Sequence, residues 1–279
     1  MKSLFAAVFS TGLLVTPAFA QSGAGTWNDL PDRYRIDTGY FRVSGNTLLH
    51  FNSPRGTGDV DFEKDLDIPQ NANTFWVDGI WRVGRRHQVE LSFTRLNRDR
   101  DNYTLTRDFQ WGGQTYNRGL SATSTTGADI LGGYYRFAAF RNERFEIGPT
   151  VGIGGLWLRA GIKATGTITG PGGTPVSRTL DETATKGHVT GAVGAYLSAW
   201  PAKRLVVRSD FLYIKVSPGE TDASVTDWRA GADYYFVRHA GVGVQYKYNK
   251  YTYNRSIVAS ELGGEVRYEG FQVFASFLF

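Results

Sequence analysis

The sequence of 279 residues contains no cysteine and only four histidines. A fold without disulfides must bury enough apolar surface in another way. Long hydrophobic runs are also missing: after residue 20 no window approaches the ~20 consecutive apolar residues that a membrane-spanning helix needs. Together with a mean hydropathy of −0.30, this excludes a helical membrane protein.

The first twenty residues have the features of a secretory signal peptide. Lys2 is followed by an apolar run over residues 4–15, a helix-breaking Pro17 and the small-residue pattern of residues 18–20. We expect cleavage before Gln21 and export of residues 21–279. These residues contain no Pro/Ser-rich linker, so the sequence predicts a single domain.

Alternation of apolar and polar residues with period two runs through the exported chain, which is rich in glycine (34 residues) and in aromatic residues (14%). Helical periodicity is found only in the signal peptide. The pattern predicts ten β-strands, near residues 36–52, 74–84, 87–105, 122–140, 144–165, 186–200, 204–217, 224–237, 240–254 and 264–279.

The connections between these strands alternate in length. Short turns are expected at 84–87, 141–144, 201–204 and 238–239, and longer or polar connections at 53–73, 106–121, 166–185, 218–223 and 255–263. This alternation is typical of a closed antiparallel transmembrane β-barrel, with short periplasmic turns and longer outer loops. We expect about ten strands, with eight as the alternative.

Alternation alone does not exclude a soluble β-sandwich or lipocalin-like barrel. Two further patterns favour the membrane. The polar face carries charges of both signs, which suits a narrow lumen of ion pairs: Asp78, Arg82, Glu90, Arg136, Glu146, Arg208, Asp210, Arg229 and Asp233. Aromatic residues gather toward strand ends, as interfacial girdles require: Tyr40, Phe41, Trp81, Tyr135, Phe137, Trp157, Tyr213, Trp228, Phe236 and Tyr248.

The last strand ends the sequence on an apolar face. That face holds Phe271, Val273, Ala275, Phe277 and Phe279. With the signal peptide and the strand pattern, it resembles the small single-chain outer-membrane β-barrel proteins of Gram-negative bacteria, although Phe274 stands where the family often has glycine.

The resemblance implies a place in the outer membrane, among phospholipids and lipopolysaccharide. It also implies that Phe271, Val273, Phe277 and Phe279 form a signal for the barrel-assembly machinery. We expect a monomer without a cofactor and without nucleic-acid binding.

An acidic segment is the sharpest local feature. Its carboxylates alternate at Asp59, Asp61, Glu63, Asp65 and Asp67, so an extended chain would place all five on one edge. Such oxygens suit Ca²⁺ or Mg²⁺, but the spacing is not that of an EF-hand. A solvated acidic strand, or pairing with loop arginines, is the favoured interpretation.

The short turns contain many basic residues, namely Arg85, Arg86, Arg141, Arg144, Lys203, Arg204 and Arg238. They suit either contact with lipid phosphates or simple solubility of the turns. His50 and His188 lie near the expected outer strand ends, but neither has a recognisable catalytic motif around it.

We therefore expect a non-enzymatic barrel with a narrow, side-chain-filled lumen and a structural or passive small-solute role. A lipid-modifying or proteolytic enzyme and a loop-based surface-binding protein remain the alternatives.

Overall fold

The computed structural model describes residues 30–53, 56–106, 108–111, 114–169, 175–216, 221–257 and 260–279; the expected signal peptide lies outside them. The strands are β1 (Tyr34–Ser53), β2 (Gly56–Asp61), β3 (Asn71–Gly84), β4 (His87–Thr104), β5 (Phe109–Trp111), β6 (Gln114–Tyr116), β7 (Ser121–Phe137), β8 (Phe140–Arg141), β9 (Phe145–Thr169), β10 (Pro175–Ala202), β11 (Leu205–Val216), β12 (Thr221–Val237), β13 (Ala240–Ile257) and β14 (Ser260–Leu278). The helix α1 spans Phe62–Asp65.

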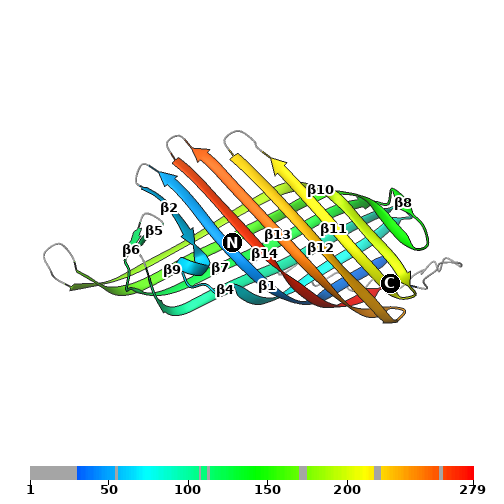
Figure 1. The fold of residues 1–279 in the computed structure, drawn as a ribbon, viewed down its shortest axis with the longest axis horizontal. Coiled ribbons are helices and arrows are strands. Elements are labelled where there is room, and N and C mark those ends of the chain that lie inside the picture. The colour runs from blue at the N-terminus through cyan, green and yellow to red at the C-terminus, as the bar shows by residue number, and fades with distance from the viewer. Residues whose placement is uncertain are drawn as a thin grey trace, which may run out of the picture.

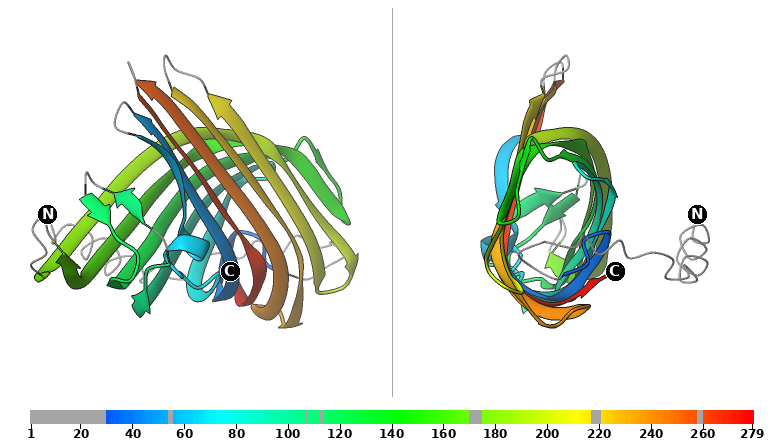
Figure 2. Two further views of the ribbon diagram at one scale, coloured as in Figure 1. Left: turned by 60° about the vertical axis from the view of Figure 1, so that its left-hand side comes forward. Right: turned by 90° about the vertical axis from the view of Figure 1, so that its right-hand side faces the viewer.

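Ten of these strands form one closed antiparallel barrel, which confirms the predicted fold (Figures 1 and 2). Each barrel strand pairs with the next along the chain, and the barrel closes where β14 pairs with β1. The backbones of Tyr34 and Phe279 exchange two hydrogen bonds of 2.9 Å at this seam. β2, β8 and the β5–β6 hairpin are additions to the ten.

Several strands are longer than expected. β9 and β10 stay paired from Phe145↔Ala199 out to Thr169↔Pro175, so much of the predicted loop at 166–185 is strand. The predicted loop at 255–263 is likewise mostly strand. Among the short turns, those at 85–86 and 238–239 are tight, whereas the connection after β7 is widened by β8.

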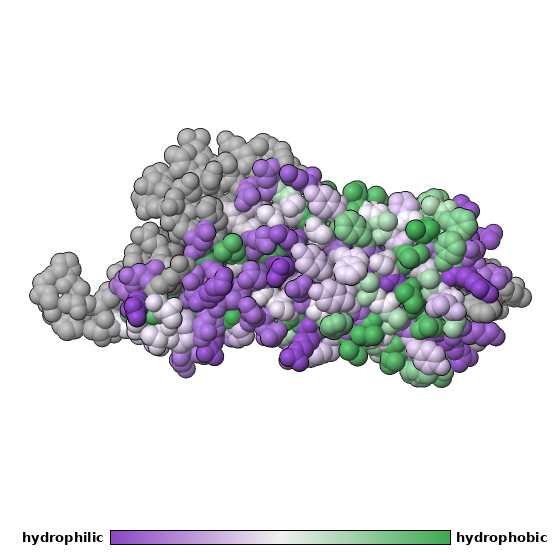
Figure 3. Space-filling view, in the orientation of Figure 1, coloured by the Kyte–Doolittle hydropathy of each residue, from purple (hydrophilic) through white to green (hydrophobic). Residues whose placement is uncertain are grey.

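Apolar side chains cover the outside of one part of the barrel, which we call the apolar belt. Figure 3 shows hydrophobic residues gathered over this part and hydrophilic ones over the opposite, long-loop end. Exposed apolar residues on every barrel strand form the belt, for example Phe75, Ile153, Val189, Val244 and Phe271. Polar neighbours in sequence point into the lumen, as the alternation predicts.

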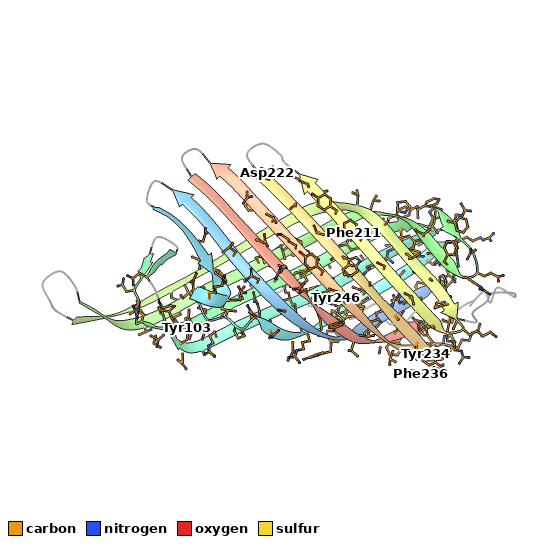
Figure 4. The ribbon with its side chains drawn as sticks, in the orientation of Figure 1. Tyr103, Phe211, Asp222, Tyr234, Phe236 and Tyr246 are labelled. Atoms are coloured by element: carbon orange, nitrogen blue, oxygen red, sulfur yellow. The ribbon has the colours of Figure 1, made fainter. Side chains whose placement is uncertain are left out.

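Aromatic residues lie at the edge of the belt. Tyr234 and Phe236, 55% and 54% exposed, sit at the short-turn end of β12, and Asp222 lies at its other end (Figure 4). Most residues of the predicted girdle are on the outside, but Phe41 is 0% exposed and points into the lumen. Its prediction as an interfacial residue was wrong, because alternation gives two faces without saying which one is inside.

No helix among the described residues is long and apolar enough to cross a membrane.

Candidate functional site

The lumen near the short-turn end is filled by a layer of ion pairs. Five arginines and six carboxylates project inward from seven strands and are mostly buried: Arg35, Arg82, Arg136, Arg208, Arg229, Asp37, Asp78, Glu90, Glu146, Asp210 and Asp233. This ion layer contains all nine charged residues that the sequence assigned to the polar face. It confirms the predicted lumen of crossed ion pairs.

Arg229 is the centre of one half of the ion layer. Its Nη1 lies 2.7 Å from Asp78 Oδ2 and its Nε 3.0 Å from Asp210 Oδ2, while Nη2 contacts Glu90. Arg136 holds Asp210 at 2.6 Å and also contacts Glu90. These contacts bridge β3, β4 and β7 to β11 and β12 across the lumen, because the two groups of strands are not neighbours in the sheet.

The other half of the ion layer is built around Asp37. This carboxylate accepts hydrogen bonds from Arg35 and from Ser276 Oγ at 2.6 Å, and it lies 3.3 Å from Arg208 Nη1. Arg208 also pairs with Asp233. Because Asp37 is on β1 and Ser276 is on β14, this group fixes the barrel seam from the inside.

Next to the ion layer an apolar cluster, which we call the aromatic layer, fills part of the lumen, while β13 contributes the buried polar residues Lys247 and Asn249 beside it. Side chains from six strands form the aromatic layer: Phe41, Val43, Trp76, Leu96, Ala128, Ile130, Leu156, Val266, Tyr268 and Phe274. The rings of Trp76 and Phe274 meet edge to face, with centroids 5.3 Å apart. A small cavity of about 20 Å³ lies beside this aromatic layer, enough for one water molecule.

The outer mouth is covered by the connection from β1 to β3. Phe62 and Leu66 from this connection pack on inward residues of β4, β7 and β9, namely Tyr103, Ala122 and Ile162. A buried ion pair fixes this connection to β4: Glu63 Oε1 lies 2.5 Å from Arg98 Nη1. Glu63 Oε2 also accepts the Thr47 amide at 2.8 Å.

The acidic segment is not an extended edge, and that prediction was wrong. The chain turns into α1 at Phe62, because the Asp61 side chain caps the helix by accepting the amides of Glu63 and Lys64. Asp59 remains on β2, and Asp65 Oδ2 accepts the Asp61 amide at 2.8 Å. Asp67 pairs with Arg100 at 2.7 Å.

The carboxylates of this segment therefore point to separate partners, as the loop-arginine alternative predicts. In the described ranges no three acidic or histidine side chains are grouped closely enough to hold a metal ion. Burial alone would raise the pKa of Asp61, but hydrogen bonds from the Lys64 side chain and from the α1 amides outweigh it and lower this pKa.

We expect Ca²⁺ to stabilise the refolded protein no more than Na⁺ at equal ionic strength. Internal pairs such as Glu63–Arg98 already satisfy the carboxylates, and mass-action stabilisation needs a site that the ion can occupy. Thermal melts in Ca²⁺, Na⁺ and chelator provide the measurement. A Ca²⁺-specific rise in melting temperature that Asp61→Asn/Glu63→Gln abolishes would instead make this segment a metal site.

The four residues of the expected assembly signal all face outward. Phe271, Val273, Phe277 and Phe279 are 62%, 57%, 39% and 53% exposed. Phe279 also closes the seam through its backbone, so its expected assembly role would coincide with a structural one.

Deleting Phe279 is expected to lower the amount of folded barrel in the outer membrane. The deletion removes both backbone bonds to Tyr34 and the aromatic end of the expected signal. Heat-modifiable gel mobility of membrane fractions measures this, with Phe279→Tyr as the control that keeps the backbone bonds and an aromatic end. Equal levels of folded barrel in the deletion and the wild type would refute the assembly role.

His50 and His188 lie on β1 and β10, but their side chains are outside the described part. The buried pair Glu63–Arg98 and the aromatic layer were missed from sequence. The sequence offered two signals for these features. Phe41 and Val43 are apolar residues on the lumen-facing side of β1, and Asp61 is a helix-capping residue before a polar stretch.

Comparisons with known proteins give a fold and no family. No family model and no curated protein sequence matches the chain. Among solved structures, the outer-membrane protease OmpT from Escherichia coli is similar with a TM-score of 0.57 and 12% identity, covering 89% of this chain and 97% of that one.

Two further neighbours are more distant. The translocator domain of the autotransporter NalP from Neisseria meningitidis has a TM-score of 0.47 at 11% identity, covering 91% of both chains. Ail from Yersinia pestis has a TM-score of 0.30 at 11% identity, covering 87% of this chain and 99% of that chain.

The chain has the fold of a bacterial outer-membrane β-barrel. Its closed barrel, outward apolar belt and charged lumen are the features that a membrane-spanning barrel requires. Fold and surface together place the protein in the outer membrane. The likeness to a protease concerns the fold alone.

Proposed function

We propose that the protein is a structural barrel of the outer membrane whose lumen does not conduct. The observation that carries this proposal is the filled lumen, in which the ion layer, the aromatic layer and the covered mouth follow one another along the axis. A passing ion would have to displace buried, paired charges and then cross an apolar layer, and both steps are costly.

Single-channel recording in a planar bilayer tests the proposal. Refolded wild-type protein, checked by heat-modifiable mobility, is expected to give no unitary steps, whereas an open porin in the same bilayer gives the positive control. Stable ohmic steps from the wild-type barrel would show that the layers leave a path and would favour a passive small-solute role.

We also infer that the protein is not an enzyme. Support comes from the lumen, where the carboxylates of the ion layer are paired with arginines. Incubation of the refolded barrel with peptide mixtures and with phospholipids tests this inference. Turnover of either substrate class above that of a heat-unfolded sample would overturn it.

A surface-binding role is the second candidate, favoured by the part beyond the apolar belt. β9 and β10 continue past the outward-facing Trp157 to Thr169 and Pro175, and β5 and β6 form a hairpin with Trp111 paired to Gln114. These paired strands extend the described surface of the barrel beyond the apolar belt. Replacing residues 109–116 with a short Gly/Ser linker should abolish cell-surface adhesion without lowering folded barrel levels; unchanged adhesion would remove this candidate.

A further inference from the structure

The rim at the short-turn end is strongly basic. Among the residues that the structure describes, eight basic residues lie in its turns and just before β1, against the acidic residues Asp32 and Glu143; they are Arg33, Arg85, Arg86, Arg141, Arg144, Lys203, Arg204 and Arg238. We call this set the basic rim.

Backbone hydrogen bonds join the turns into a continuous ring. The carbonyls of Arg86, Arg144 and Arg204 accept the amides of Ala138, Trp200 and Tyr235, which belong to the next hairpin in each case, at 2.8, 2.7 and 2.9 Å. The main chain of the turns is therefore held at fixed places around the barrel circumference, so their basic side chains start from fixed positions.

The basic rim adjoins the apolar belt directly. Val83, Phe140 and Phe236 are 47%, 52% and 54% exposed and lie within two residues of a basic residue in the same turn region. In Figure 3 a hydrophilic fringe follows the hydrophobic zone at this end of the molecule. Tight turns cannot carry their charges far from the belt, so the cations lie at the depth of lipid headgroups.

Some side chains of the basic rim form contacts within the protein, and others are exposed. Arg141 Nη2 lies 2.5 Å from Asp32, and Arg204 Nη1 donates to the Phe236 carbonyl at 3.2 Å. Arg85, Arg86 and Lys203 are exposed. The main-chain carbonyl of Arg85 accepts hydrogen bonds from the side chains of Arg82 and Arg141, and these bonds hold the turn. The Arg85 side chain can therefore be replaced without removing them.

We propose that the basic rim binds the phosphate groups of anionic phospholipids in the periplasmic leaflet. Cations next to a membrane surface attract anionic lipids, and a ring of cations around the whole circumference fits an annulus of lipids better than one protein partner on one side. The proposal rests on the membrane placement and is independent of whether the lumen conducts.

The test compares two variants that each lose three positive charges. The rim variant carries Arg85→Gln, Arg86→Gln and Lys203→Gln; the control carries Lys64→Gln, Arg118→Gln and Lys163→Gln, all exposed residues of the outer part. Heat-modifiable mobility verifies folding. Native mass spectrometry then counts phosphatidylglycerol and phosphatidylcholine retained from mixed detergent–lipid micelles.

Wild type and control should retain phosphatidylglycerol in preference to phosphatidylcholine, and the rim variant should lose about threefold or more of that preference. Raising NaCl to about 0.5 M should weaken the wild-type preference, because the interaction is screened. Excess inorganic phosphate should weaken the wild-type lipid preference no more than NaCl of equal ionic strength does, because the lipid is bound at the edge of the apolar belt.

Equal preference in the rim variant and the control would overturn the proposal. So would the absence of any preference in the wild type, a result that needs no variant to fold. Binding of purified cell-wall sacculi that the rim variant loses, without a lipid preference, would assign the basic rim to the cell wall instead.

Discussion

Arg229→Met is expected to destabilise the barrel by about 3–5 kcal/mol, because it leaves buried carboxylates without their shared counter-ion. Arg229 is the cation that contacts Asp78, Glu90 and Asp210 together. Glu90 and Asp210 still contact Arg136 in this variant, so most of the loss of stability comes from the unpaired carboxylate of Asp78. Reversible urea unfolding in lipid vesicles measures the change.

Two companion variants separate charge burial from other effects. Arg100→Gln removes one partner of the exposed pair with Asp67, whose side chains are 48% and 56% exposed, and should cost no more than about 1 kcal/mol. Adding Asp78→Leu to Arg229→Met should recover much of the loss, because the uncompensated charge is then gone. A cost for Arg229→Met as small as that for Arg100→Gln would mean that the ion layer is hydrated and open.

Val244→Arg should cost about 2–4 kcal/mol, the range for a cation on the lipid face near the bilayer midplane. Val244 is 48% exposed on β13, between Val242 and Tyr246 on the same outward face, and its register partner Val273 on β14 is also exposed. The same urea unfolding in vesicles provides the measurement.

The control for lipid exposure is Val244→Leu, which keeps an apolar surface and should change stability by less than about 0.5 kcal/mol. Gln245, the next residue, is 8% exposed and donates to Gln272 at 2.6 Å. An unchanged stability of Val244→Arg, together with a stable Gln245→Val, would reverse the two faces and favour a soluble barrel.

The strand count and the two-faced pattern could be read from sequence because alternation is a local property. Ten strands and the inward charges such as Glu90 and Asp233 are all confirmed. The strand ends could not be placed, since a polar strand above the membrane, like residues 175–185 of β10, has the composition of a loop.

The contents of the lumen depended on contacts between distant strands. Phe41, Trp76 and Tyr268 form the aromatic layer only because β1, β3 and β14 are neighbours. Glu63 reaches Arg98 across 35 residues of sequence, and no periodicity reports such a pairing. The turn into α1 had a readable signal in Asp61, but the alternating acids suggested a strand instead.

Spin-label accessibility along β13 tests most directly whether the barrel has lipid outside and a filled lumen inside. Because the chain has no cysteine, single cysteines at positions 242, 244 and 245 can be labelled cleanly in vesicles. Labels replacing Val242 and Val244 should be accessible to oxygen and shielded from a water-soluble nickel reagent. A label replacing Gln245 should be shielded from both reagents. Nickel accessibility at position 245 would reveal a water-filled lumen, and nickel accessibility at 242 and 244 would contradict the membrane placement itself.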